Sequence, residues 1–325
     1  MGRGATRALL VVAALLVLVG PPLAVAPWFG WGAAPGKEQD FVVNKGDSLA
    51  KVASRLQAQR LVRSGGQFRL LARLLGDDRP VQAGRYRLAP GQPWGEMLQT
   101  LQDGRVERHS VTIPEGWPSI MVAERLRAIP DLTGDIDVPA EGSLLPDTYA
   151  YEPGEPRAAV LKRMQGAMEK ALADLWPKRT ARTVVKTPAE AVTLASIVEK
   201  ETGKASERRT IAGVYSNRLR IGMKLDADPT VIYPITQGKP LGRRIRRSEL
   251  QRDTGWNTYV KPGLPKGPIA NPGRDSLKAV LDPGETDALF FVADGSGGHV
   301  FAATLAEHNR NRERWYAIRR QRGEM

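Results

Sequence analysis

The chain has 325 residues, enough for two domains that each bury a core, and its 42% hydrophobic content is that of an ordinary globular protein. A formal net charge of +13 favours a polyanionic partner such as nucleic acid, anionic lipid or a carboxylate-rich polymer. The absence of cysteine excludes disulfides, thiol nucleophiles and cysteine-based metal sites.

The N-terminal sequence predicts a membrane anchor. An uncharged, apolar run from Ala8 to Gly36 follows Arg3 and Arg7, and about 20 such residues suffice to span a bilayer. Arginines ahead of the span place the rest of the chain outside the cytoplasm. A signal peptide cleaved after Ala26 is the alternative, although Pro27 is unfavourable directly after a cleavage site. Three aromatic residues at the end of the run are typical of a membrane–water interface: Trp28, Phe29 and Trp31.

Residues 37–110 predict a small α/β module. A short strand from Asp40 leads through a turn at Lys45–Gly46 into a helix whose N-cap is Asp47 or Ser48. The pattern that follows predicts a helix at Gln67–Leu75, a strand within 83–91 and a helix at Trp94–Leu101.

Residues 111–325 predict a second, larger domain. A strand and turn at 108–117 lie at the junction between the two domains. The expected elements are then a helix at Pro118–Ala128, a turn at Pro146–Asp147, helices at Pro156–Leu175, 187–202 and 206–222, a hairpin of strands 288–293 and 299–303, and a basic helix at Leu305–Arg322. The segment between 223 and 287 is rich in proline and glycine, especially in the stretch "KPGLPKGPIANPG".

The helix at 187–202 has a strong start signal and an unusual end. Thr187 is the expected N-cap, Pro188 the first helical residue, and Glu190 completes a capping box. At about 100° per residue, Glu201 points within roughly 50° of the apolar face, whereas Glu199 lies about 110° away. A carboxyl group on an apolar face is kept protonated, as a general acid requires. The alternative is that the helix ends earlier and both glutamates pair with nearby lysine and arginine side chains.

Other chemistries have little support in the sequence. The three histidines show no HExxH spacing, and neither a GxSxG motif nor a nucleotide-binding glycine loop is present, so we expect no metal and no cofactor. Ser296 and His299 lie in "DGSGGH", which is better interpreted as a hairpin turn than as a catalytic pair. Carboxylates remain the candidates for catalysis.

Several sequence blocks resemble those of a known family. The stretches "LASIVEKET", "ASERRTIAGVYSNRLRIGMKLDADPTVIY", "NTYVKPGLPKGPIANPG" and "FFVADGSGGHVF" are similar, in order and content, to the YceG-like family of endolytic murein transglycosylases. The resemblance covers nearly the whole chain, weakly over 37–110 and specifically over 141–310. It implies an α+β protein with a transmembrane anchor at 1–36, a LysM-like module at 37–110 and a catalytic domain at 111–325.

The resemblance also implies an activity. Members of this family cleave nascent peptidoglycan glycan at an internal MurNAc–GlcNAc bond and leave a 1,6-anhydro-MurNAc end, which would make this chain a terminator of glycan elongation. The family's catalytic glutamate matches Glu201, and Glu199 is assigned a supporting role. Residues in the matching blocks are the candidates for substrate binding: Asn217, Asp228, Asn257, Tyr259 and Asp147.

The implied partners follow from that activity. We expect peptidoglycan glycan strands as substrate, association with peptidoglycan synthases, a single-pass location in the inner membrane with an extracytoplasmic catalytic part, and no nucleic acid. A non-catalytic, membrane-anchored scaffold that binds peptidoglycan is the alternative, with both glutamates in structural roles.

Overall fold

The computed structural model describes residues 24–31, 34–104 and 109–324, and the chain divides after His109 into two compact units. Most of the apolar run expected to form the anchor lies outside the described residues. Within the described part, no helix is long and apolar enough to cross a membrane.

The first unit contains two strands and three helices of the predicted module. They are, in order, β1 (Gln39–Val43), α2 (Leu49–Ala58), α3 (Gly65–Leu75), β2 (Gly84–Leu88) and α4 (Trp94–Asp103). β1 and β2 pair antiparallel with Phe41 opposite Tyr86, and both side chains are fully buried. Ser48 is the N-cap of α2, since its hydroxyl accepts from the N–H of Lys51. This unit thus has its own core.

Trp28 belongs to that core. The sequence groups it with Phe29 and Trp31 at the membrane interface, yet Trp28 is only 8% exposed and packs against Gly95, where a Cβ would lie 3.0 Å from its Nε1. Phe29 and Trp31 stay exposed and stack on each other with ring centroids 5.2 Å apart. The end of the apolar run therefore folds onto the module.

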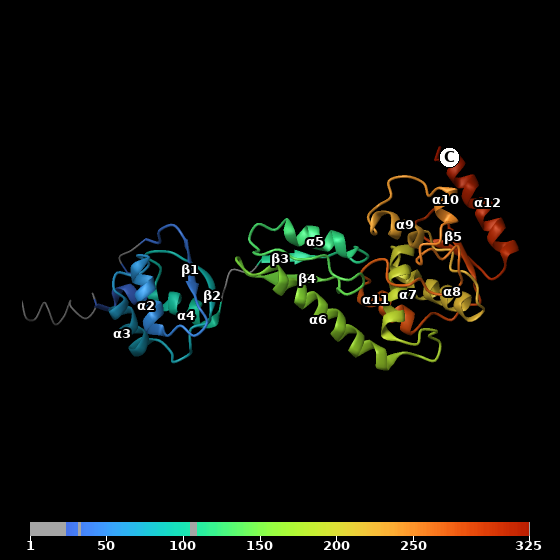
Figure 1. Cartoon of the computed structure of the whole chain (residues 1–325). Helices are drawn as coiled ribbons and strands as arrows, with labels where there is room; N and C mark the ends of the chain where they lie inside the picture. The colour runs from blue at the N-terminus through green and yellow to red at the C-terminus, as the bar shows by residue number, and fades with distance from the viewer. Residues whose placement is uncertain (1–23, 32–33, 105–108, 325) are drawn as a thin grey trace, which may run out of the picture. The chain divides into compact units, whose positions relative to one another are not determined.

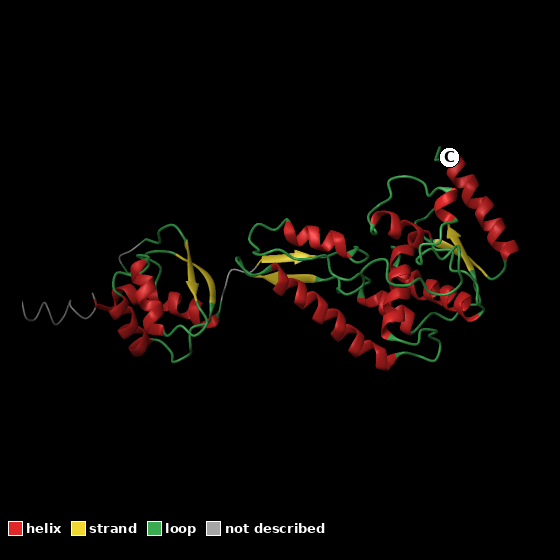
Figure 2. Cartoon of the chain, viewed as in Figure 1, coloured by secondary structure: helices red, strands yellow, loops and turns green. Residues whose placement is uncertain are grey.

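The second unit is mixed α and β, and helices make up most of its regular secondary structure (Figure 2). It contains β3 (His109–Thr112), α5 (Ser119–Arg127), β4 (Thr148–Tyr151), α6 (Arg157–Leu175), η1 (Trp176–Lys178), α7 (Pro188–Glu201), η2 (Ala205–Glu207), α8 (Arg208–Arg220), α9 (Asp228–Thr236), α10 (Arg247–Leu250), α11 (Arg274–Leu281), β5 (Phe290–Ala293), β6 (His299–Ala302) and α12 (Leu305–Gln321). Among the described strands, β3 pairs with β4 and β5 with β6, each as a two-stranded sheet.

Two hydrophobic cores lie along α6. Val160 and Met164 pack with residues of β3, β4 and α5, while Met168 and Ala171 pack with residues of α7, α8 and α11. Figure 1 shows α6 running from the β3–β4 sheet to this group of helices. The second core holds α7, whose residues 191–198 are all buried.

The predicted hairpin is confirmed, and helices also form in the proline- and glycine-rich segment that precedes it. β5 and β6 pair with Phe291 opposite Phe301. α9 and α11 form in the proline- and glycine-rich segment because Pro229 occupies the first turn of α9, where it needs no hydrogen-bond donor, and Gly273 is the N-cap of α11.

Candidate active site

α7 begins at a defined cap. The Thr187 hydroxyl accepts from the N–H of Glu190 at 3.1 Å, and Pro188 occupies the first helical position, as the sequence predicts. The Glu190 carboxylate accepts from the N–H of Lys186 at 2.6 Å rather than from that of Thr187. The second half of the expected capping box is therefore shifted by one residue, which still satisfies an N–H at the helix start.

α7 ends at Glu201. Thr202 has extended backbone angles, φ −141° and ψ 132°, so it cannot continue the helix. The alternative in which the helix stops before Glu201 is thus not what the structure shows. Glu201 is held at the end of a helix whose residues 191–198 are all buried.

The carboxyl group of Glu201 is surrounded by protein, although part of the residue reaches solvent. The Tyr215 hydroxyl, on α8, donates a hydrogen bond to it. The pKa of Glu201 is raised to about 7, mainly by burial: the Tyr215 hydrogen bond and the Arg218 charge lower it, and the nearby Asp228 carboxylate adds to the increase. Near neutral pH, protonated and ionised Glu201 are therefore both well populated.

Asp228 and Tyr259 form a pair beside Glu201. The Tyr259 hydroxyl donates to Asp228 Oδ1 at 2.6 Å, and both residues interact electrostatically with Glu201. Burial and the bond to Asp228 raise the pKa of Tyr259 far above its ordinary value, so its hydroxyl stays protonated. Asp228 is the first residue of α9 and is exposed. The structure therefore brings two of the predicted substrate-binding residues to Glu201.

Arg218, which the sequence analysis missed, connects the site to the hairpin. Its guanidinium is nearly buried and donates to the main-chain oxygens of Leu289, at 2.6 Å, and Leu225, at 2.8 Å. It also lies over the Phe290 ring, 5.3 Å from the centroid. One cation therefore fixes the loop before α9 and the start of β5 around the site.

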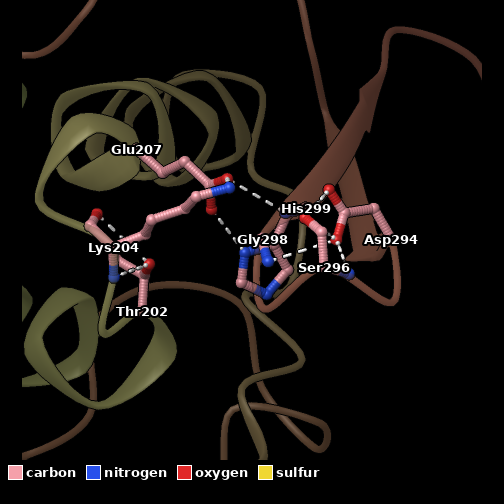
Figure 3. Close-up of polar contacts among 7 residues, drawn as sticks. All are labelled: Thr202, Lys204, Glu207, Asp294, Ser296, Gly298 and His299. Carbon is pink, nitrogen blue, oxygen red and sulfur yellow. Dashed lines mark hydrogen bonds and ion pairs between the residues drawn. The ribbon is translucent and has the colours of Figure 1, made fainter.

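The tip of the hairpin is held against the segment that follows Glu201 (Figure 3). Glu207 Oε2 lies 2.8 Å from His299 Nδ1, and Glu207 Oε1 accepts from the His299 N–H at 3.1 Å. Gly298 lies close to both side chains, because a Cβ there would lie 2.4 Å from Glu207 Oε1 and 2.5 Å from Lys204 Nζ, and the ends of these side chains would have to shift. Burial favours a higher pKa for Glu207, but the bonds from His299 lower it on balance.

The expectation of a turn at "DGSGGH" is confirmed. Asp294 Oδ1 accepts from the N–H groups of Ser296, at 2.7 Å, and Gly298, at 3.1 Å, and the Ser296 hydroxyl also binds Asp294 (Figure 3). His299 packs edge-on against Phe291, which in turn packs edge-on against Tyr215. The hairpin thus supports the tyrosine that binds Glu201.

Glu199 has different partners from Glu201. Its side chain is 6% exposed, its Oε2 accepts from the N–H of Gly273 at 2.9 Å, and its Oε1 lies 3.6 Å from Arg208 Nη2. Arg208 also lies 3.5 Å from Glu115. Burial, together with the Glu199 charge, raises the pKa of Glu115. These contacts join α7 to the starts of α8 and α11, a supporting position.

Three predicted residues make mainly main-chain contacts. Asn217 Nδ2 donates to the carbonyls of Thr286 and Ala288, and Asn257 Nδ2 donates to three carbonyls in residues 249–252. Asp147 is exposed, and its Oδ1 accepts from the N–H of Thr148 at 2.7 Å. Within the described residues, no group of three or more histidine, aspartate or glutamate side chains is arranged to hold a metal ion.

Comparison with known proteins places this arrangement in a family. Residues 41–314 match the YceG-like family. The chain belongs to the YceG-like family. An endolytic murein transglycosylase of Bacillus subtilis is 29% identical over 317 residues, covering 86% of this chain and 85% of that protein. One of Streptococcus pneumoniae is 27% identical over 83% of this chain, which spans 57% of that longer protein. A solved yceG-like protein of Listeria monocytogenes is similar with a TM-score of 0.53, 26% identity, and coverage of 85% and 99%.

The geometry of this YceG-like protein predicts how Glu201 titrates. We expect its carboxyl group to titrate near pH 7 in the folded protein, and Tyr215→Phe to raise that midpoint because the Tyr215 bond lowers the pKa of Glu201. Carbon-13 NMR of the side-chain carboxyl, assigned by its loss in Glu201→Gln, measures both. Tyr233→Phe is the matched control, since Tyr233 binds Glu141 instead. A midpoint near 4.5, or the same midpoint in Tyr215→Phe, would contradict this environment.

Proposed function

We propose that this chain is an endolytic peptidoglycan lytic transglycosylase with Glu201 as its catalytic acid and base. The observation that carries the proposal is the burial of the Glu201 carboxyl group at the end of α7, which raises its pKa to about 7. A general acid works best when its pKa lies near the working pH. The names of the Bacillus and Streptococcus relatives, endolytic murein transglycosylase, support the same substrate and reaction.

The proposed reaction has two proton transfers on one residue. Protonated Glu201 gives its proton to the glycosidic oxygen while the bond from C1 to that oxygen breaks. The Glu201 carboxylate then takes the proton from the C6 hydroxyl of the same MurNAc, and O6 bonds to C1 to close the 1,6-anhydro ring. Glu201 ends protonated, and no water is consumed.

The neighbours of Glu201 suit these steps. The Tyr215 hydrogen bond stabilises the carboxylate form that appears after the first transfer and holds its orientation. The Asp228 carboxylate is placed to favour the positive charge that develops at C1, and the neutral Tyr259 hydroxyl keeps it in position. Asn257, Asn217 and Asp147 shape the surrounding loops in this proposal, because their side-chain groups bind main-chain atoms.

The two glutamates are expected to respond differently to substitution. Glu201→Gln keeps the size of the side chain but cannot transfer a proton, so turnover should fall by about 10² to 10⁴ or more without loss of folding. Glu199→Gln should lower the melting temperature more than the rate, because it removes a buried charge that faces Arg208. The measurement is mass spectrometry of the glycan products, with thermal melting of each variant.

The product mass separates this proposal from its competitors. A 1,6-anhydro end is one water lighter than a hydrolysed end, so hydrolysed ends would show that a water, rather than the C6 hydroxyl, attacks C1. Near-normal turnover by folded Glu201→Gln would remove Glu201 from the reaction. Glycan binding without any cleavage by the wild-type protein would favour the scaffold function.

We propose further that the apolar N-terminal run anchors the protein in the inner membrane, with the catalytic part outside the cytoplasm and close to peptidoglycan synthases. Residues 37–110 would then act as a LysM-like module that sets the height of the active site above the membrane. The full-length protein is expected in the membrane pellet, with its N-terminus intact by protein sequencing. A soluble product that starts at Pro27 would show instead that the run is a cleaved signal peptide.

A further inference from the structure

A cavity of about 520 Å³ lies beside α9, and no step of the proposed reaction uses it. Val231, Pro234 and Ile235 line it from α9, while Arg252, Asp253 and Thr254 line it from the loop after α10. Pockets of about 300–1,000 Å³ are typical of sites for small ligands. We call this space the α9 cavity.

The α9 cavity is built on the same two segments as the Asp228–Tyr259 pair. The hydroxyls of Thr230 and Thr258 are 2.9 Å apart in the interior, and the N–H of Thr258 also donates to Thr230 at 3.2 Å. Val231 follows Asp228 by three residues, which is about one helical turn. The cavity therefore begins about one helical turn along α9 from Asp228, on two segments that hydrogen bonds join.

The lining matches the two-sided chemistry of an amino sugar. Ile235 is 42% exposed and, with Val231 and Pro234, offers an apolar surface to the C–H face of a pyranose ring or to an acetamido methyl group. On the other side, the Thr254 hydroxyl already accepts from two main-chain N–H groups and keeps its own proton for a sugar oxygen. A purely apolar ligand would leave this polar side unsatisfied.

Arg252 is the cation that lines the cavity. The Glu249 carboxylate is bound by Arg243, at 2.9 Å and 2.5 Å, and Asp253 pairs with Lys261 at 2.5 Å. The main-chain oxygen of Arg252 is held by Asn257 Nδ2 at 2.9 Å. Across the described ranges, its exposed guanidinium makes no hydrogen bond or ion pair with another residue. A fixed backbone therefore presents a free guanidinium, a group suited to binding a carboxylate.

We propose that the α9 cavity is a substrate subsite for a peptide-bearing MurNAc of the glycan strand, and that Arg252 binds a carboxylate of the stem peptide. This rests on the proposed function and deepens it, because the site then distinguishes glycan that carries peptides from glycan that does not. The apolar wall holds the sugar, and Arg252 recognises the peptide.

The test compares two substrates and three variants. Full-length protein is assayed on linear glycan with intact stem peptides and on the same glycan after enzymatic removal of the peptides. Arg252→Gln should lower kcat/KM on the peptide-bearing glycan about tenfold, the effect of losing one charge-assisted hydrogen bond, and leave the peptide-free glycan nearly unchanged. Ile235→Asp should slow cleavage of both. Arg244→Gln, which removes an exposed arginine from the connection before α10 that does not line the cavity, is the matched control and should change neither.

The outcomes separate the subsite from the function. If Arg252→Gln behaves like Arg244→Gln on the peptide-bearing glycan, Arg252 is not the carboxylate-binding group and the proposal is overturned. It is overturned as well if folded Ile235→Asp cleaves both substrates at the wild-type rate, because the cavity then holds no sugar. Failure of the wild-type protein to form anhydro ends on either glycan would instead count against the proposed function.

Discussion

A carboxyl group that must be buried at the end of an apolar helix is the constraint around which the second unit is arranged. Burying an ionised carboxylate is costly, and here it raises the pKa of Glu201 to about 7. Between pH 4.5 and 7 the folded protein therefore holds a proton that the unfolded chain has lost, so this group's contribution to stability decreases as pH rises through that window. Its cost above pH 7 is at most about 3 kcal/mol, and the partial solvent access of the residue makes it smaller.

The surrounding elements reduce that cost without removing it. Tyr215 supplies a hydrogen bond, and Arg218 supplies a positive charge at longer range. Arg218 is itself held by main-chain oxygens, and the hairpin packs on Tyr215 through Phe291. The Glu207–His299 contact fixes the hairpin tip to the segment after α7. These contacts together position the two residues that tune Glu201.

Helical phase and capping predicted the position of Glu201, because both depend on residues close in sequence. Thr187 and Pro188 start α7 where expected, and 14 residues of helix bring Glu201 to its end. The role of Glu199 was not predictable in detail, since it depends on Gly273 and Arg208, which only the tertiary fold brings near it. Tyr215 was missed for a related reason: it lies on the apolar face of α8 with Ile211 and Ala212, a pattern typical of an ordinary core tyrosine.

For the polar residues chosen from the matching sequence blocks, the role of each side chain likewise depends on contacts that only the tertiary fold creates. Asp228 and Tyr259 meet through a side-chain hydrogen bond across 31 positions of sequence, and the structure places them beside Glu201. Asn257, two residues before Tyr259, has its amide occupied by three carbonyls. Sequence alone does not distinguish an asparagine that binds the main chain from one that binds a ligand. The proline and glycine content of residues 223–287 likewise gave no indication of α9, although the first turn of that helix accommodates Pro229.

The pH dependence of kcat/KM for glycan cleavage tests most directly whether the protonation of buried Glu201 controls catalysis. Because the free enzyme must carry the proton on Glu201, the account predicts full activity below pH 7 and a decline governed by one ionisation near pH 7. A rate that stays constant from pH 6 to 9, or that already falls through a single ionisation near 4.5, would contradict it.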